Sequence, residues 1–303
     1  MKFIIQKHAL PIGFLLLFYS NLVSQTNWFT LESSLFRIYY SEEDDKSAEE
    51  LSTLLDIEYA DLVSKIGLEI NNTVSVFLCP SEEIFNELTG KFVPDWGEGV
   101  TDPVRNLIIL KSPNLSQNLS RFPKLVLHEL THILVGQSLE HPAAIPRWFN
   151  EGIAIYFSHD EEFSIGQAIS KALISNSIIS LDEIDDVLKF QQEKARLAYE
   201  ESYSAILFLE EKYGYNRLFQ LIQELKKEKN FNQAFLDIFG IDLFEFEWAW
   251  NQYVEKKYRW QFLLDFETYL WIFILVLFIL VFIAIRFRNR KILNKWQQEE
   301  RIV

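Results

Sequence analysis

The stretch Leu127-His128-Glu129-Leu130-Thr131-His132 decides how the rest of this chain has to be arranged. Residues four apart share one face of an α-helix, so His128 and His132 can point at one metal ion. Glu129 faces the same cavity from the side, where it can reach a water at the ion rather than the ion itself. The stretch therefore predicts a helix that carries two metal ligands and a general base.

A third ligand is expected further along, because such a site needs three protein donors and one open position. Eighteen residues separate His132 from Glu151, which gives the pattern H-E-x-x-H-x18-E. The alternative is a surface helix whose histidines face solvent. That alternative is disfavoured because the helix is apolar nearly all round, and buried polar groups need partners. Its apolar residues are Leu125, Val126, Leu127, Leu130, Ile133, Leu134 and Val135.

These motifs resemble the gluzincin class of zinc metallopeptidases, and the wording IPRWFNEGIAIYFS around Glu151 is most similar to its peptidase-MA-like group. The resemblance implies one Zn²⁺ per chain, bound by His128, His132 and Glu151, with Glu129 as the general base. It also implies a tyrosine that stabilises the oxyanion from a helix after Glu151. Tyr199 is the chosen candidate, with Tyr203 as an alternative and His141 as a third.

Two positions depart from the class. No acidic residue lies four after Glu151, where Ile155 stands, so a carboxylate that supports the ligands must come from elsewhere or be absent. The aminopeptidase branch of the class carries a G-x-M-E-N motif. The stretch 96–99 (WGEG) is only weakly similar to it. Endopeptidase activity is therefore favoured over aminopeptidase activity.

The two ends of the chain indicate a membrane protein. Lys2 and Lys7, an apolar run and a small polar stretch predict a signal peptide over 1–24, with an uncleaved membrane anchor as the alternative. A transmembrane helix is predicted over 268–286, followed by a basic tail over 287–303. The positive-inside rule places this tail in the cytoplasm and the catalytic domain, 25–263, outside it.

Composition narrows the remaining possibilities. The net charge is −14 and no basic patch lies outside the C-terminus, which argues against nucleic acid as a partner. The single cysteine, Cys79, follows an apolar run and is expected to be a buried strand-end residue. No intramolecular disulfide is possible.

The fold class follows from hydrophobic periodicity and from the resemblance: an α+β, zincin-like domain with a small mixed sheet and a helical C-terminal lobe. Strands are expected over 34–40, 73–78 and 106–111, with helices over 46–66 and, as a short helix that opens at Pro80, through Thr89. Residues 90–103 are expected to form a loop. Five further helices are expected over 163–177, 181–190, 194–213, 215–227 and 230–238. By resemblance, the strand over 106–111 could be an edge strand that pairs with an extended peptide.

The favoured function is a membrane-anchored zinc metallopeptidase that hydrolyses peptide bonds of peptide or protein substrates outside the cytoplasm. The alternative is a catalytically silent domain that keeps its zinc and serves as a tethered peptide-binding or sensor module.

Overall fold

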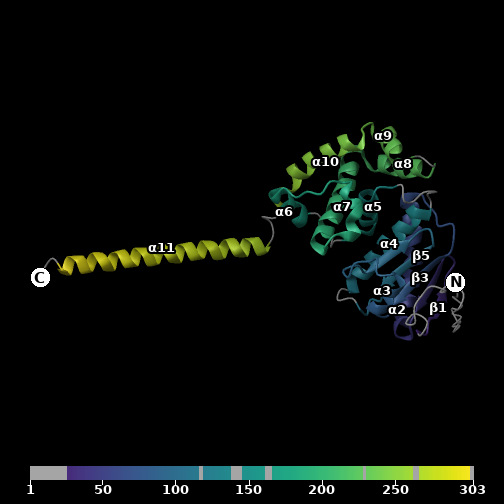
Figure 1. Cartoon of the computed structure of the whole chain (residues 1–303), viewed down its shortest axis with the longest axis horizontal. Coiled ribbons are helices and arrows are strands. Elements are labelled where there is room, and N and C mark those ends of the chain that lie inside the picture. Colours follow the sequence, from purple (N-terminus) through teal and green to yellow (C-terminus); the bar gives the residue numbers. More distant parts are fainter. Residues whose placement is uncertain are drawn as a thin grey trace.

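The computed structural model describes residues 26–115, 119–137, 145–160, 166–227, 230–261 and 266–300. The predicted signal peptide and His141 lie outside these residues. Figure 1 shows a sheet with helices on both faces, a helical lobe beside it, and one long helix that extends away from the body.

The sheet has five strands in the order β1-β2-β3-β5-β4. Their bounds are β1 (Phe29–Glu32), β2 (Phe36–Tyr40), β3 (Val74–Cys79), β4 (Gly99–Asp102) and β5 (Leu107–Lys111). The three central strands are parallel, whereas β1 and β4 pair antiparallel with their neighbours. The sheet is therefore mixed, as the sequence predicts, and the α+β zincin-like fold class is confirmed.

Alternation along the strands sends side chains to two separate cores. Val76, Leu78 and Ile108 join the main core with helix α2 (Asp45–Ile66), whose C-terminus is closed by Gly67 in the left-handed conformation. Phe77 and Cys79 face a smaller cluster under helix α3 (Glu82–Leu88). Cys79 is buried, as expected.

Three expectations about the sheet are wrong. The strand β1 is not among the predicted elements, and the predicted loop over 90–103 contains β4. Because β4 pairs with β5, the strand near 106–111 lies inside the sheet, and β4 is the edge strand on that side.

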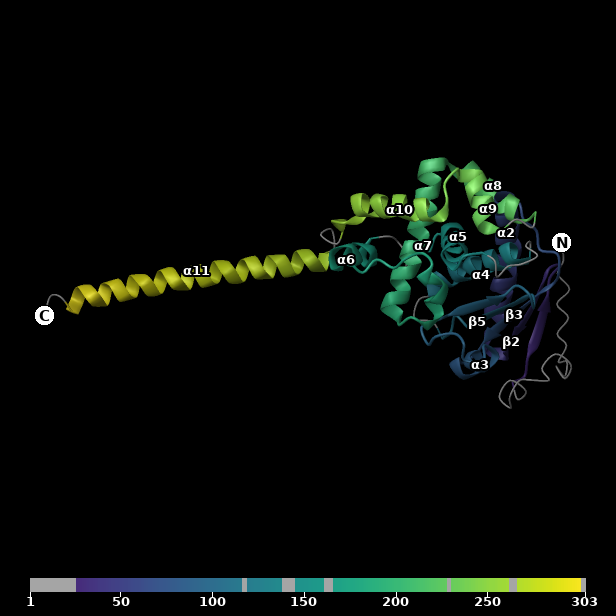
Figure 2. The same cartoon turned by 45° about the horizontal axis from the view of Figure 1, so that its top comes forward.

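The helical lobe follows the sheet in sequence. Its elements are α5 (Arg147–Ser158), α6 (Gln167–Ser175), η5 (Glu183–Lys189), α7 (Gln192–Tyr213), α8 (Tyr215–Leu225), α9 (Phe231–Phe239) and α10 (Leu243–Tyr258). The predicted helix over 181–190 is the 3₁₀ segment η5. Helix α4 (Phe122–Gln137) lies between the sheet and this lobe (Figure 2).

The long helix α11 (Phe266–Glu300) contains a candidate membrane span, Tyr269–Leu293, that is long and apolar enough to cross a membrane. Its apolar run ends at Ile285, and Arg286, Arg288, Arg290 and Lys291 follow. None of that run is buried against other described residues.

Candidate metal centre

Helix α4 presents His128 and His132 on the face that looks toward α5. The rest of this helix is held in the core, because Leu130, Ile133 and Leu134 are fully buried against the sheet and the lobe. The backbone of α4 is therefore fixed on several sides, and the two imidazoles project one turn apart from a rigid support.

Helix α5 delivers Glu151. This helix begins directly after Pro146 and lies close to α7 at Gly152. A Cβ atom on Gly152 would lie 2.4 Å from the Ser202 carbonyl oxygen and 2.6 Å from Cγ1 of Ile206. Only glycine allows this approach, so the glycine that follows Glu151 sets the distance between α5 and α7.

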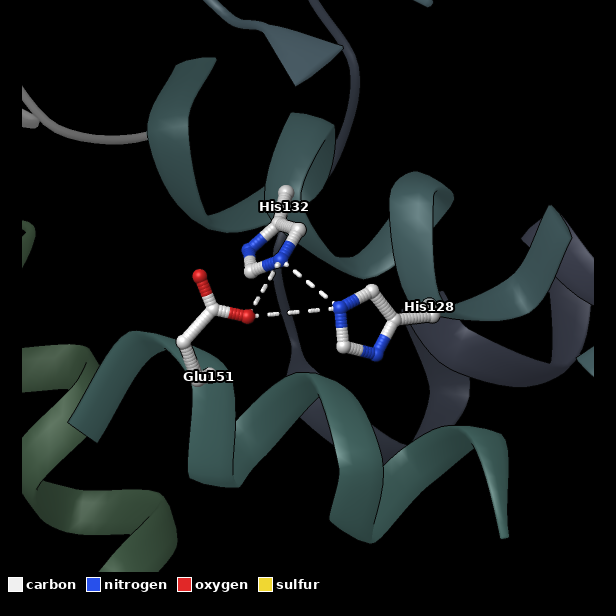
Figure 3. Close-up of side chains that lie close together, drawn as sticks. All are labelled: His128, His132 and Glu151. Atoms are coloured by element: carbon white, nitrogen blue, oxygen red, sulfur yellow. Dashed lines mark hydrogen bonds and ion pairs between the residues drawn. The ribbon is translucent and has the colours of Figure 1, made fainter. Parts of the chain in front are cut away.

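Three donor atoms converge between α4 and α5 (Figure 3). The His128 and His132 Nε2 atoms are 3.1 Å apart, and Oε2 of Glu151 lies 3.4 Å from each of them. A tetrahedral zinc ion with bonds of about 2.0–2.2 Å requires neighbouring donors to be roughly 3.3–3.5 Å apart. The residues therefore fit a zinc ion with almost no rearrangement.

The electrostatics of the cluster favour an anionic Glu151. Burial alone would raise the pKa of this carboxyl, but the charges of His132 and Arg147 hold the pKa well below its usual range. The Arg147 Nε atom forms an ion pair with Oε1 of Glu151 at 3.0 Å. One carboxylate oxygen thus faces the histidines while the other is held by Arg147, which occupies the supporting role that the sequence left open at Ile155.

Glu129 lies against the edge strand. The Thr101 hydroxyl on β4 donates a hydrogen bond to Oε2 of Glu129 at 2.7 Å. A Cβ atom on Gly99 would lie 2.9 Å from Oε1 of Glu129, so the glycine leaves the space that this carboxylate occupies. Glu129 is 5% exposed and is not one of the three residues whose donor atoms converge. This position suits a group that handles protons beside the ion.

A cavity of about 170 Å³ opens beside these residues. His128 and Glu129 line it on one side, with Trp96 and Gly99 from the segment around β4 and Tyr199 from α7. The cavity therefore joins the histidine helix, the edge strand and the helical lobe.

Of the three candidates for the oxyanion donor, Tyr199 and Tyr203 differ in their position relative to the cavity. Tyr199 lines the cavity and stacks edge-on against Trp96, with ring centroids 6.1 Å apart. Burial, followed by the charge of Glu151, raises its pKa, so the hydroxyl stays protonated. Tyr203 does not line this cavity, and its pKa is raised by burial and then by Glu210. His141 lies outside the described residues.

The cavity is also lined by a group of charged residues that the sequence analysis did not predict. Arg121 pairs with Glu98 (Nη1 to Oε2, 2.6 Å) and with Asp160 (Nε to Oδ2, 3.0 Å). All three residues line the cavity. Glu98 could have been suspected from the WGEG stretch, whereas Arg121, Asp160 and Thr101 lie in no recognisable motif.

Comparison with known proteins identifies a family that matches this chain. A family model described as the Peptidase MA superfamily matches residues 58–256, a range that includes His128, Glu129, His132 and Glu151. No curated protein matches the chain. The yeast LTA4 hydrolase in complex with bestatin is similar at 17% identity and a TM-score of 0.43, over 77% of this chain and 38% of that one. A mutant M1 zinc metallopeptidase from Deinococcus radiodurans is similar at 15% identity and a TM-score of 0.38, over 75% of this chain and 51% of that one. The chain spans less than two thirds of the length of either structure.

Proposed function

The chain belongs to the peptidase MA superfamily, and on that premise we propose that it is a membrane-anchored zinc metallopeptidase that acts outside the cytoplasm. The observation that carries this proposal is the convergence of one oxygen and two nitrogen donors at 3.1–3.4 Å, beside a separate carboxylate and a cavity.

The ligands in this proposal are Nε2 of His128, Nε2 of His132 and Oε2 of Glu151. When bound, zinc supplies a Lewis acid that polarises a carbonyl group and lowers the pKa of a coordinated water. Two neutral imidazoles and one carboxylate leave the site with a net positive charge, which suits that chemistry.

Glu129 is the proposed general base. Its carboxylate takes a proton from a water in the cavity as the water oxygen forms a bond to the peptide carbonyl carbon. The same carboxyl then gives the proton to the amide nitrogen as the carbon–nitrogen bond breaks. The products are a free carboxyl and a free amine, so atoms and charge balance. Thr101 orients Glu129 through its hydrogen bond to Oε2.

Tyr199 is the proposed oxyanion donor. Its hydroxyl remains protonated, because burial and nearby carboxylates raise its pKa. It can therefore donate a hydrogen bond to the carbonyl oxygen as negative charge develops there.

An extended substrate is proposed to pair with β4, because this is the edge strand and it reaches Glu129 through Gly99 and Thr101. Endopeptidase action is favoured, because Glu98 is already paired with Arg121 at 2.6 Å. A carboxylate in such a pair is poorly suited to hold the free amine of an aminopeptidase substrate.

The proposed topology rests on the apolar run of α11 and on the basic residues that follow it. A signal peptide over 1–24 starts export, 25–263 form the catalytic domain, 268–286 span the bilayer and 287–303 stay in the cytoplasm.

The test compares the purified full chain with Glu129→Gln for zinc content and for hydrolysis of casein and a peptide library. We expect one zinc per chain in both proteins and a loss of hydrolysis of roughly 10²–10⁴-fold in the variant. Equal hydrolysis in both proteins, or zinc without hydrolysis of any substrate in the wild type, would overturn the proposal.

A further inference from the structure

The place where the chain leaves the catalytic domain is fixed to α6. After α10 ends at Tyr258, the Ser170 hydroxyl on α6 donates a hydrogen bond to the Arg259 carbonyl oxygen at 3.1 Å. The side chain of Gln261 packs over Gly166, where an added Cβ atom would lie 2.7 Å from its Nε2 atom. The exit is therefore docked on the body of the protein.

The same helix is attached to α7 by a buried carboxylate. Oε2 of Glu200 accepts hydrogen bonds from the backbone N–H groups of Gly166, Ala168 and Ile169, at 3.1–3.4 Å. Glu200 is completely buried, and a carboxylate at the N-terminus of a helix is favoured by the helix dipole. The start of α6 is thus held against α7.

The catalytic cavity uses the same part of α7. Tyr199 directly precedes Glu200, and Arg196, which also lines the cavity, pairs with Oε1 of Glu200 at 3.4 Å. Glu200 and Tyr199 therefore link the exit of the chain and the cavity through adjacent residues. Both views of the molecule show α6 between α7 and the start of α11 (Figures 1 and 2).

The connection to the apolar helix is short. Only residues 262–265 separate Gln261 from Phe266, and the apolar run begins at Tyr269. A chain advances at most about 3.3–3.6 Å per residue, so this connection spans no more than roughly 15–20 Å. Trp260, 65% exposed, and Tyr269 flank it, and such aromatic residues favour the interface between membrane and water.

We propose that the substrates are extramembrane segments of other membrane-anchored polypeptides, cut close to the bilayer surface. This inference rests on the proposed function and on the membrane span. The short connection and the docked exit keep the cavity at a limited height above the bilayer. A target segment on another anchored protein reaches that height at high effective concentration, whereas a segment far from the bilayer does not.

The experiment uses the full chain in lipid vesicles, with a cleavable sequence first selected from a peptide library. That sequence is placed in two single-span reporters, about 5 and about 40 residues from the bilayer, and is also supplied as a free peptide. A Pro-rich spacer of about 12 residues, inserted between Gln261 and Phe266, raises the domain by roughly 35 Å. The matched control carries the same spacer after Val303.

The wild type and the control are expected to cleave the near reporter at least about tenfold faster than the distant one. The spacer variant should lose or reverse this preference, while all three proteins cleave the free peptide equally. The same ratio of reporter cleavage in the wild type and the spacer variant would overturn the inference and leave the peptidase intact. Failure of all three proteins to cleave any peptide would instead remove the proposed function, and the inference with it.

Discussion

At the scale of single residues, the site separates a group that supports a proposed metal ligand from groups that line the cavity. Glu151 offers one oxygen to the histidines and keeps the other on Arg147. Glu129 and Tyr199 instead face the cavity. Substitutions of the two kinds should therefore change different measured quantities.

Arg147 is a positioning residue in this account. Arg147→Met should weaken zinc binding by roughly 10–100-fold, because Glu151 loses the contact that orients it. Arg147→Lys keeps the charge but not the guanidinium, so its zinc affinity should fall between those of the wild type and the Met variant. Competition with a chelator measures these affinities. Tighter zinc binding by the Met variant would mean that charge repulsion, not orientation, governs this contact.

Tyr199→Phe removes only the hydroxyl group. If that hydroxyl stabilises the oxyanion, kcat should fall by roughly 10²–10³-fold with little change in KM or in zinc content. The matched control is Tyr203→Phe, four residues further along α7 and outside the cavity lining. Steady-state kinetics on a library-selected peptide measures both variants. Equal losses in the two would assign the effect to helix packing rather than to catalysis.

Much of the site could be predicted from sequence because its information is local. His128, Glu129 and His132 lie within two turns of one helix, and Glu151 lies in the next helix. Arg121 and Asp160 could not be predicted in the same way. Their meeting depends on how the ends of α4 and α5 approach the segment around Glu98, which is a tertiary arrangement.

At the scale of elements, the edge strand β4 is a strand that hydrophobic periodicity does not predict. Its four residues, GVTD, include glycine and aspartate, which are depleted in strands, so the sequence predicts a loop there. Pairing with β5 makes it a strand. The overlooked signal is the turn that joins them, where Asp102 accepts a hydrogen bond from the Arg105 N–H and Asn106 adopts a positive φ of 53°.

The contact between α5 and α7 gives a prediction at this scale. Gly152→Ala would place a methyl group 2.4 Å from the Ser202 carbonyl oxygen, so the two helices must separate. We expect a loss of about 1–3 kcal/mol in the free energy of unfolding. Asn150→Ala, on the same helix, should change it by less than about 0.5 kcal/mol. Chemical denaturation of both variants in detergent measures the difference, and equal stabilities would contradict the close approach.

At the scale of the whole molecule, the acidic catalytic domain and the basic tail lie on opposite sides of the apolar run of α11. The sequence predicts this arrangement from the length of the apolar run and from the basic residues that follow it. The proposed height of the catalytic domain above the bilayer, however, depends on the contacts among α6, α7 and the exit of the chain. These contacts cannot be predicted from the sequence.

The proposed topology gives a further prediction. In sealed cells, protease added from outside should digest the catalytic domain and leave a tag placed after Val303 intact. Permeabilised cells provide the control in which the tag is also digested. Loss of the tag in sealed cells would reverse the proposed orientation.

The proposed function depends on His128, His132 and Glu151 binding one zinc ion. Metal analysis and X-ray absorption at the zinc edge, on the purified full chain and on Glu151→Gln, measure this binding. We expect one zinc per chain, with nitrogen and oxygen neighbours at about 2.0–2.2 Å and two imidazoles, and weaker retention of zinc in the variant. No zinc in the wild type, or sulfur among the neighbours of the zinc, would show that these residues do not form the zinc site.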